Sequence, residues 1–172
     1  MTADPAAGPP VEVMIEDERW EAVGLEALAD EAVRAVLTAV GRDPECHEIS
    51  LLACDDARIA ELNAAFRGKA VATNVLSWPS FSGVVPEPES GGTGEALFLG
   101  DLALAYETCA AEAVAGGRPF EAHLRHLVVH GVLHLLGHDH ESDAEAEEME
   151  ALEAKILARM GVPDPYDWIA RP

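Results

Sequence analysis

The sequence predicts a mixed α/β fold in one domain, with a metal site on a central helix. Segments typical of strands and of helices alternate along the chain. The 172 residues suffice for one hydrophobic core, and two would be small. Three histidines, His130, His134 and His140, lie in and just after an apolar helical segment. We therefore expect a single metal-dependent hydrolase domain over residues 11–172.

The first half of the chain reads as two strand–helix pairs. Residues 1–10 contain three prolines among small residues and are predicted to be a disordered tail. Val11 to Ile15 alternates like a strand, and Leu25 to Val40 has helical apolar spacing before Gly41. Glu48 to Cys54 is a second predicted strand. Asp55 and Asp56 then offer N-caps for a helix that runs to about Phe66.

Two further strands flank a polar loop. Thr73 to Trp78 is rich in strand-forming residues and is stopped by Pro79. Residues 80–96 are mostly Ser, Gly, Pro and Glu, which predicts a loop or flexible insertion. Leu97 to Ala103 is the next predicted strand, with a glycine inside it.

Three helices complete the chain. Tyr106 to Ala115 ends at a glycine pair, and Pro119 is expected in the first turn of the following helix, where proline is tolerated. That helix is apolar nearly all round, which is typical of a helix packed on several sides. The last helix begins at Ser142, which forms a capping box with Glu145. Its acidic residues are interpreted as a solvated face, opposite an apolar stripe of Met149, Leu152, Ile156 and Met160.

The charge excludes a general nucleic-acid-binding surface. Eleven basic and 32 acidic residues give a formal net charge of −21, and phosphate backbones are bound mainly through Lys and Arg. An RNA substrate would have to meet a local basic patch, for which Arg58, Arg67 and Lys69 are the candidates, together with a metal ion.

Cysteine use and hydropathy point to a cytoplasmic protein without a membrane anchor. Cys46, Cys54 and Cys109 have no C-x-x-C spacing and an odd count, so we expect reduced, buried thiols. No signal peptide is evident near the N-terminus, and no run of about 18 apolar residues occurs.

The histidine spacing favours a catalytic metal site. On a helix, His130 and His134 are separated by about 40° and about 6 Å of rise, so their rings can converge. Gly137 can end the helix and turn the chain so that His140 joins them. Three imidazoles leave a fourth coordination position for water or substrate, as in catalytic zinc sites. We expect one Zn²⁺ per chain, although imidazoles also suit nickel, copper or iron.

Two other interpretations of the histidines are weaker. Single histidines on apolar helices are usually hydrogen-bonded core residues, but three together would be costly to bury without a shared partner. Metzincin peptidases have the same spacing, with a general-base glutamate directly after the first histidine. Gly131 occupies that position here.

Four segments of residues 60–140 resemble the YbeY family of bacterial endoribonucleases. The family helix is similar to HGVLHLLGHDH at 130–140, and its L-N-x-x-[YF]-R motif is similar to Leu62-Asn63 with Phe66-Arg67. Its T-[DN]-V-L-S-F-P and L-G-D motifs resemble residues 73–79 and 99–101. Trp78 and His138 depart from the more usual Phe and Tyr.

The resemblance implies a sheet of about four strands packed by about five helices, with the metal helix across it. It also implies a single-strand-specific, metal-dependent endoribonuclease that acts in ribosomal RNA maturation, at the 16S rRNA 3′ end, and in ribosome quality control. The expected partners are rRNA and the ribosome or its proteins, without DNA specificity. Arg67 is the expected phosphate contact and catalytic residue beside His134, while Asp139 is a candidate to orient a ligand and His138 to carry a proton.

Two alternative functions remain open at this point. The first is a non-catalytic, metal-stabilised factor that binds the ribosome, which the net charge of −21 favours. The second is a metallopeptidase.

Overall fold

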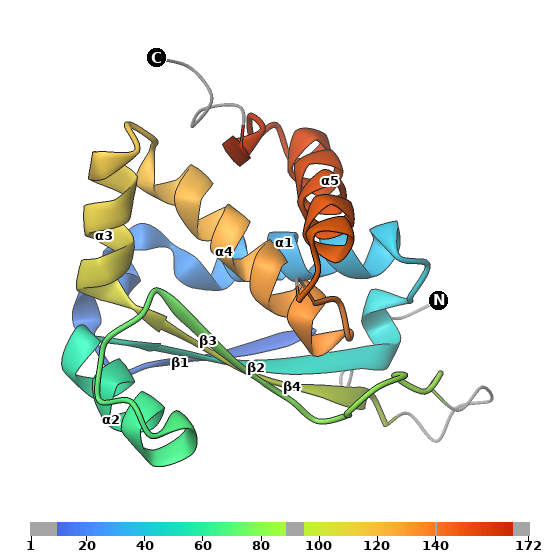
Figure 1. Cartoon of the computed structure of the whole chain (residues 1–172), viewed down its shortest axis with the longest axis horizontal. Helices are drawn as coiled ribbons and strands as arrows, with labels where there is room; N and C mark the ends of the chain where they lie inside the picture. Colours follow the sequence, from blue (N-terminus) through green and yellow to red (C-terminus); the bar gives the residue numbers. More distant parts are fainter. Residues whose placement is uncertain (1–9, 89–94, 140, 167–172) are drawn as a thin grey trace, which may run out of the picture.

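Four strands form one mixed sheet with the order β1-β2-β4-β3 (Figure 1). The computed structural model describes residues 10–88, 95–139 and 141–166. The strands are β1 (Val11–Ile15), β2 (His47–Cys54), β3 (Val75–Pro79) and β4 (Leu97–Ala105). β1 and β4 both run parallel to β2, whereas β3 is an antiparallel edge strand. The predicted mixed sheet of four strands is confirmed.

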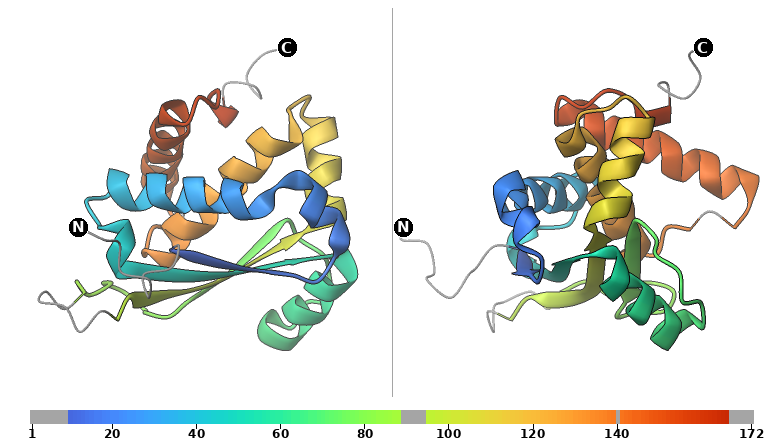
Figure 2. Two further views of the ribbon diagram at one scale, coloured as in Figure 1. Left: turned by 180° about the vertical axis from the view of Figure 1, so that it is seen from behind. Right: turned by 90° about the vertical axis from the view of Figure 1, so that its left-hand side faces the viewer.

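Helices cover the two faces of the sheet unequally. The α-helices in the described chain are α1 (Leu25–Ala39), α2 (Asp56–Arg67), α3 (Tyr106–Ala115), α4 (Phe120–Leu135) and α5 (Asp143–Arg159). α2 lies on one side of the sheet, and the other four lie on the opposite side (Figures 1 and 2). None of the helices in the described ranges is long and apolar enough to span a membrane.

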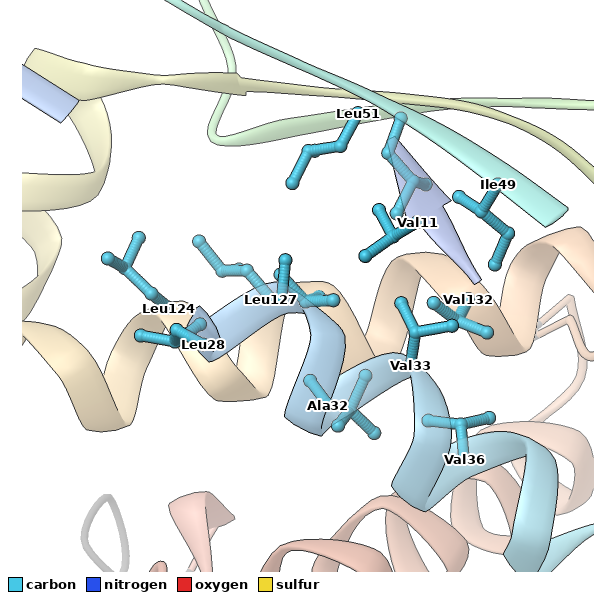
Figure 3. Close-up of a cluster of buried hydrophobic side chains, with 14 of the residues drawn as sticks. Val11, Leu28, Ala32, Val33, Val36, Ile49, Leu51, Leu124, Leu127 and Val132 are labelled. Atoms are coloured by element: carbon cyan, nitrogen blue, oxygen red, sulfur yellow. The ribbon is translucent and has the colours of Figure 1, made fainter. Parts of the chain in front are cut away.

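The main hydrophobic core lies between the sheet, α1 and α4 (Figure 3). Leu51 and Ile49 of β2 face Val33 of α1 and Val132 of α4, and all four side chains are fully buried. A smaller cluster lies beneath α2, around Ile59, Leu76 and Ala103 among others. α4 is therefore held against the sheet on one side and against α1 on another, which explains its apolar sequence.

The predicted ends of most elements agree with the structure. Asp55 accepts a hydrogen bond from the Arg58 backbone N–H at 2.8 Å, and Ser142 accepts one from Glu145 at 3.1 Å, so both predicted N-caps are present. Gly41 follows α1 with φ 77°, a left-handed conformation that glycine adopts without strain.

Several predicted boundaries were wrong. The expected tail extended to Pro10, but Pro10 is buried and its carbonyl accepts a 2.7 Å bond from Ile49; residues 1–9 lie outside the described residues. Pro119 is the N-cap of α4 rather than its first helical residue, and Pro79 belongs to β3. The described residues 80–88 of the predicted loop contain no helix or strand, as expected, although Val85 is buried there and its carbonyl accepts a 3.0 Å bond from Arg42.

Two short 3-10 helices were not predicted. They are η1 (Glu18–Val23) and η2 (Pro44–Cys46), each with an aspartate N-cap. In η1, Trp20 is fully buried and its indole N–H donates to the Cys54 carbonyl at 2.8 Å. This tertiary contact, rather than local apolar periodicity, explains why a short helix forms there.

Candidate metal centre

A cleft of about 850 Å³ opens along the exposed edge of the sheet, between α4 and the end of α2. It brings together segments far apart in the sequence: the loop after α2, strand β3, residues 81–83, α4 and Tyr166. The predicted site residues among its described lining are Arg67, Lys69, His130, His134, His138 and Asp139. These residues, which lie far apart in the sequence, therefore line one cleft.

α4 places two of the predicted ligands on successive turns. The Nε2 atoms of His130 and His134 face each other at 3.0 Å, and both side chains are half-buried. This convergence is what the spacing of four predicts.

The helix ends immediately after these histidines. The backbone N–H of Gly137, with φ 96°, donates to the His134 carbonyl, and that of His138 donates to the Leu133 carbonyl, each at 3.0 Å. These two bonds form a Schellman motif, which confirms the predicted stop at Gly137. The third predicted ligand, His140, lies outside the described residues, and among the side chains that are described no group of three or more His, Cys, Asp or Glu is arranged to hold a metal ion.

A buried carboxylate contacts the back of this histidine pair. Glu153 of α5 is 0% exposed, and its carboxylate lies 3.2 Å from Nδ1 of His130 and 2.9 Å from Nε2 of His126. Tyr166 donates its hydroxyl proton to the same carboxylate at 2.8 Å. Burial raises the pKa of Glu153, but the hydrogen bonds with His126 and His130 outweigh it and lower that pKa to about 2.

Sequence reasoning missed His126, Glu153 and Tyr166. The acidic side of α5 was expected to be solvated, and this is wrong for Glu153. Its position could have indicated otherwise, because Glu153 is four residues after Met149 and three before Ile156, on the buried stripe. Likewise, His126 precedes His130 by four residues on the same face of α4. Tyr166 gives no comparable signal.

The opposite wall of the cleft is built by the end of α2. Gly68 ends the helix with φ 73°, and the buried Asn63 donates its side-chain amide to the Val71 carbonyl at 3.0 Å. Arg67 is exposed and donates from Nη2 to the Ser77 carbonyl on edge strand β3 at 3.2 Å. Within the L-N-x-x-F-R sequence, Asn63 therefore fixes the loop after α2, and Arg67 joins the end of this helix to β3.

The cleft is less acidic than the protein as a whole. Arg67 and Lys69 are the basic residues of its described lining, and Asp139 is the acidic one. Arg58, the third member of the predicted patch, does not line the cleft and instead forms ion pairs with Glu16 and Glu61, both at 3.3 Å. The predicted basic patch is thus reduced to two residues.

A second polar cluster supports the start of β3. Asn74, which lines the cleft, donates to Glu112 of α3 at 3.0 Å, and Glu112 also contacts Nε2 of His123 at 2.9 Å. Burial lowers the pKa of His123, although Glu112 opposes this effect. The cluster ties β3 to α3 and α4.

Gly131 has a packing role beside the candidate ligands. A Cβ atom at this position would lie 2.8 Å from Cδ2 of Leu102 in β4. A glutamate here would therefore begin its side chain against the sheet, which is a further argument against the metzincin arrangement.

The cysteines are placed away from the site. Cys54 and Cys109 are buried as predicted, whereas Cys46 is partly exposed, so the predicted burial is wrong for Cys46. Burial raises the pKa of the Cys54 thiol to about 12. None of the three lines the cleft, in agreement with their predicted non-catalytic role.

The spacing of the two described histidines fits that of zinc ligands. Two nitrogen ligands on tetrahedral zinc, with bonds of about 2.0 to 2.1 Å, are separated by about 3.3 Å. The Nε2 atoms of His130 and His134 are 3.0 Å apart. Glu153 behind His130 is the kind of hydrogen-bond partner that metal-bound imidazoles usually have.

Comparisons with known proteins agree on one family. The family model described as Endoribonuclease YbeY matches residues 12–161. The Endoribonuclease YbeY of Jannaschia sp. is 53% identical over 161 residues, covering 91% of this chain and 99% of that protein. The Endoribonuclease YbeY of Dinoroseobacter shibae is 52% identical over 170 residues, covering 95% and 93%. The solution structure of TM1509 from Thermotoga maritima shares the fold, with a TM-score of 0.58 and 23% identity over 94% of this chain and 93% of that one.

Proposed function

Because the chain belongs to the YbeY endoribonuclease family, we propose that it cuts single-stranded ribosomal RNA at a metal site made by His130, His134 and His140. We assign it to rRNA maturation, at the 16S rRNA 3′ end, and to ribosome quality control in the cytoplasm, with the ribosome or its proteins as partners. One observation carries this assignment above all. The converging Nε2 atoms of His130 and His134 and the guanidinium of Arg67 line the same cleft.

The proposed cofactor is one Zn²⁺ ion per chain. When bound by three imidazoles, zinc acts as a Lewis acid and lowers the pKa of a coordinated water to about 7. His130 and His134 would supply Nε2 ligands from one helix face, and His140 would supply the third ligand. Gly137 supports this arrangement because it ends α4 before the chain reaches His140.

Arg67 is proposed to bind the scissile phosphate. A guanidinium has five N–H donors, so the bond from Nη2 to Ser77 leaves others to contact phosphate oxygens. That bond also holds the side chain against β3, at the edge of the cleft. A planar cation placed there can stabilise charge that develops on the phosphate during cleavage.

The test is cleavage of end-labelled single-stranded RNA by the full chain. Wild-type, chelator-treated and His134→Ala proteins are compared, and bound zinc is measured by mass spectrometry. We expect about one zinc per wild-type chain, and loss of both zinc and cleavage in His134→Ala, because a three-ligand site loses a third of its donors.

Each contrary outcome has a clear meaning. Cleavage that persists in His134→Ala and is retained by repurified protein would indicate a different active site and would reject the proposed one. Wild-type protein that binds zinc and ribosomes but cleaves no RNA would favour a non-catalytic ribosome-binding factor. Cleavage of a labelled peptide would revive the peptidase interpretation.

A further inference from the structure

We propose that Glu153, held by His126 and Tyr166, is a positioning residue that fixes the ring orientation and tautomer of His130 for metal binding. The inference rests on the proposed function, because it assigns His130 as a ligand. It extends that function to α5 and to the segment after it, neither of which supplies a proposed ligand.

The carboxylate of Glu153 is buried and contacts three side chains among the described residues. Oε1 lies 2.9 Å from Nε2 of His126 and 2.8 Å from the Tyr166 hydroxyl. Nδ1 of His130 lies 3.2 Å from each of the two carboxylate oxygens. The three partners come from α4 and from the segment after α5, so the carboxylate joins two separate parts of the chain.

These contacts allow only one neutral tautomer of His130. An ionised carboxylate only accepts hydrogen bonds, so Nδ1 of His130 must carry the proton. In the neutral ring, Nε2 then has the lone pair. Nε2 is the atom that faces His134 at 3.0 Å, which is where a metal ion would be shared.

His126 and Tyr166 in turn hold Glu153. His126 is one turn before His130 on α4, and the two ring centroids are 6.3 Å apart. Tyr166 is brought to α4 by the C-terminal segment, where Arg118 donates to the Pro165 carbonyl at 3.2 Å. The neighbours of Glu153 along the buried stripe of α5, Met149 and Ile156, are apolar. An apolar residue would serve packing at this position with less desolvation, so the buried charge indicates a role toward His130.

The first experiment reads the tautomer in the metal-free, full-length protein. Ring ¹⁵N chemical shifts distinguish Nδ1–H from Nε2–H imidazole. We expect His130 to be in the Nδ1–H form in the wild type and to become a mixture in Glu153→Leu, which has no acceptor, whereas the amide oxygen of Glu153→Gln can still accept. Retention of the pure Nδ1–H form in Glu153→Leu would overturn the proposal.

The second experiment measures zinc affinity by competition with a chromogenic chelator. Glu153→Gln is expected to weaken binding by about 10-fold to 100-fold, as for other outer partners of metal-bound histidines. Tyr166→Phe keeps the charge and removes one hydrogen bond, so a smaller loss is expected. Glu148→Gln is the matched control, because Glu148 is exposed on the same helix and the charge change is identical.

The outcomes separate this inference from the proposed function. Equal zinc affinity in the wild type, Glu153→Gln and Tyr166→Phe would overturn the role of Glu153 and leave the metal site intact. A wild type that binds no zinc would reject the proposed metal site. The tautomer measurement, made without metal, would still test whether Glu153 fixes the Nδ1–H form of His130. If the Glu153 variants fail to fold, Tyr166→Phe decides: unchanged zinc affinity would overturn the proposal, whereas the His130 tautomer should stay Nδ1–H because the carboxylate remains.

Discussion

Arg67 differs from Arg58 in where its guanidinium lies. It donates to a backbone carbonyl on the edge of the sheet and lines the cleft, whereas Arg58 is held by two carboxylates outside it. We predict that Arg67→Ala retains full zinc binding but lowers kcat/KM for single-stranded RNA by about 100-fold or more, the usual effect of removing a donor to a developing charge. Metal analysis and RNA cleavage on the same samples check this.

Two substitutions sharpen the test of Arg67. Arg67→Lys restores the charge but not the planar fork of donors, so partial recovery is expected. Arg58→Ala removes one positive charge outside the cleft and should leave kcat/KM within about 2-fold of the wild type, since exposed ion pairs contribute little. Equal losses in Arg67→Ala and Arg58→Ala would mean that total charge matters and that Arg67 has no specific role.

At the residue scale, the sequence predicts groups with a recognisable spacing and misses groups brought together by folding. His130 and His134 follow from helix geometry, and Arg67 was identified by family resemblance. The acidic composition of α5 favours a solvated interpretation of Glu153, although its position on the stripe of Met149 and Ile156 indicates burial. Its contact with His126 and His130 depends on α5 packing against α4, which the pattern of α5 alone does not specify.

Gly100 of β4 packs closely against β3 and α4, two elements that line the cleft. It follows a β-bulge in β4 and has φ 140°, and a Cβ there would lie 2.3 Å from the Trp78 carbonyl and 2.9 Å from Leu135 of α4. We predict that Gly100→Ala lowers the free energy of unfolding by at least about 2 kcal/mol, because β3 or α4 must move to accommodate the methyl group. Urea denaturation measures this change.

Gly24→Ala provides the comparison for Gly100. Gly24 also has a positive φ, of 72°, but no atom of the described chain lies within 4 Å of the place that a Cβ would occupy there. Only the left-handed conformation of a non-glycine residue is then penalised, by about 1 kcal/mol. A loss in Gly24→Ala as large as in Gly100→Ala would show that backbone conformation, and not the close approach of β3 and α4, makes Gly100 necessary.

At the element scale, strands and helices with clear periodicity or capping residues were predicted well. α3 agrees at both ends, and α1 and α2 each agree within one residue at their ends. The 3-10 helices η1 and η2 were missed because they are too short to show a period, and Trp20 is fixed by a contact with Cys54 far along the chain. The order of the strands was not predicted from periodicity, since pairing depends on contacts between distant segments.

At the scale of the whole molecule, the distribution of charge separates the cleft from the remaining surface. The net charge is −21, yet the described lining of the cleft carries Arg67 and Lys69 against Asp139. RNA is therefore repelled at long range and attracted only close to the cleft. The repulsion extends over about 30 Å at 0.01 M salt and about 8 Å at 0.15 M.

This distribution predicts an unusually weak salt dependence for a ribonuclease. Each phosphate neutralised on a single strand contributes about −0.7 to the slope of log affinity against log salt. Arg67, Lys69 and a metal ion together allow a slope no steeper than about −2, and screening of the acidic surface should make it shallower still. KM for a short single-stranded RNA, measured between about 0.01 and 0.15 M KCl, checks this.

A triple Glu→Gln change at Glu147, Glu148 and Glu150, all exposed on α5, should lower KM at low salt and steepen the slope, because it removes repulsion and leaves the cleft unchanged. A wild-type slope much steeper than about −2 would instead require additional basic contacts, supplied by residues outside the described cleft, and would contradict recognition by two cations and a metal.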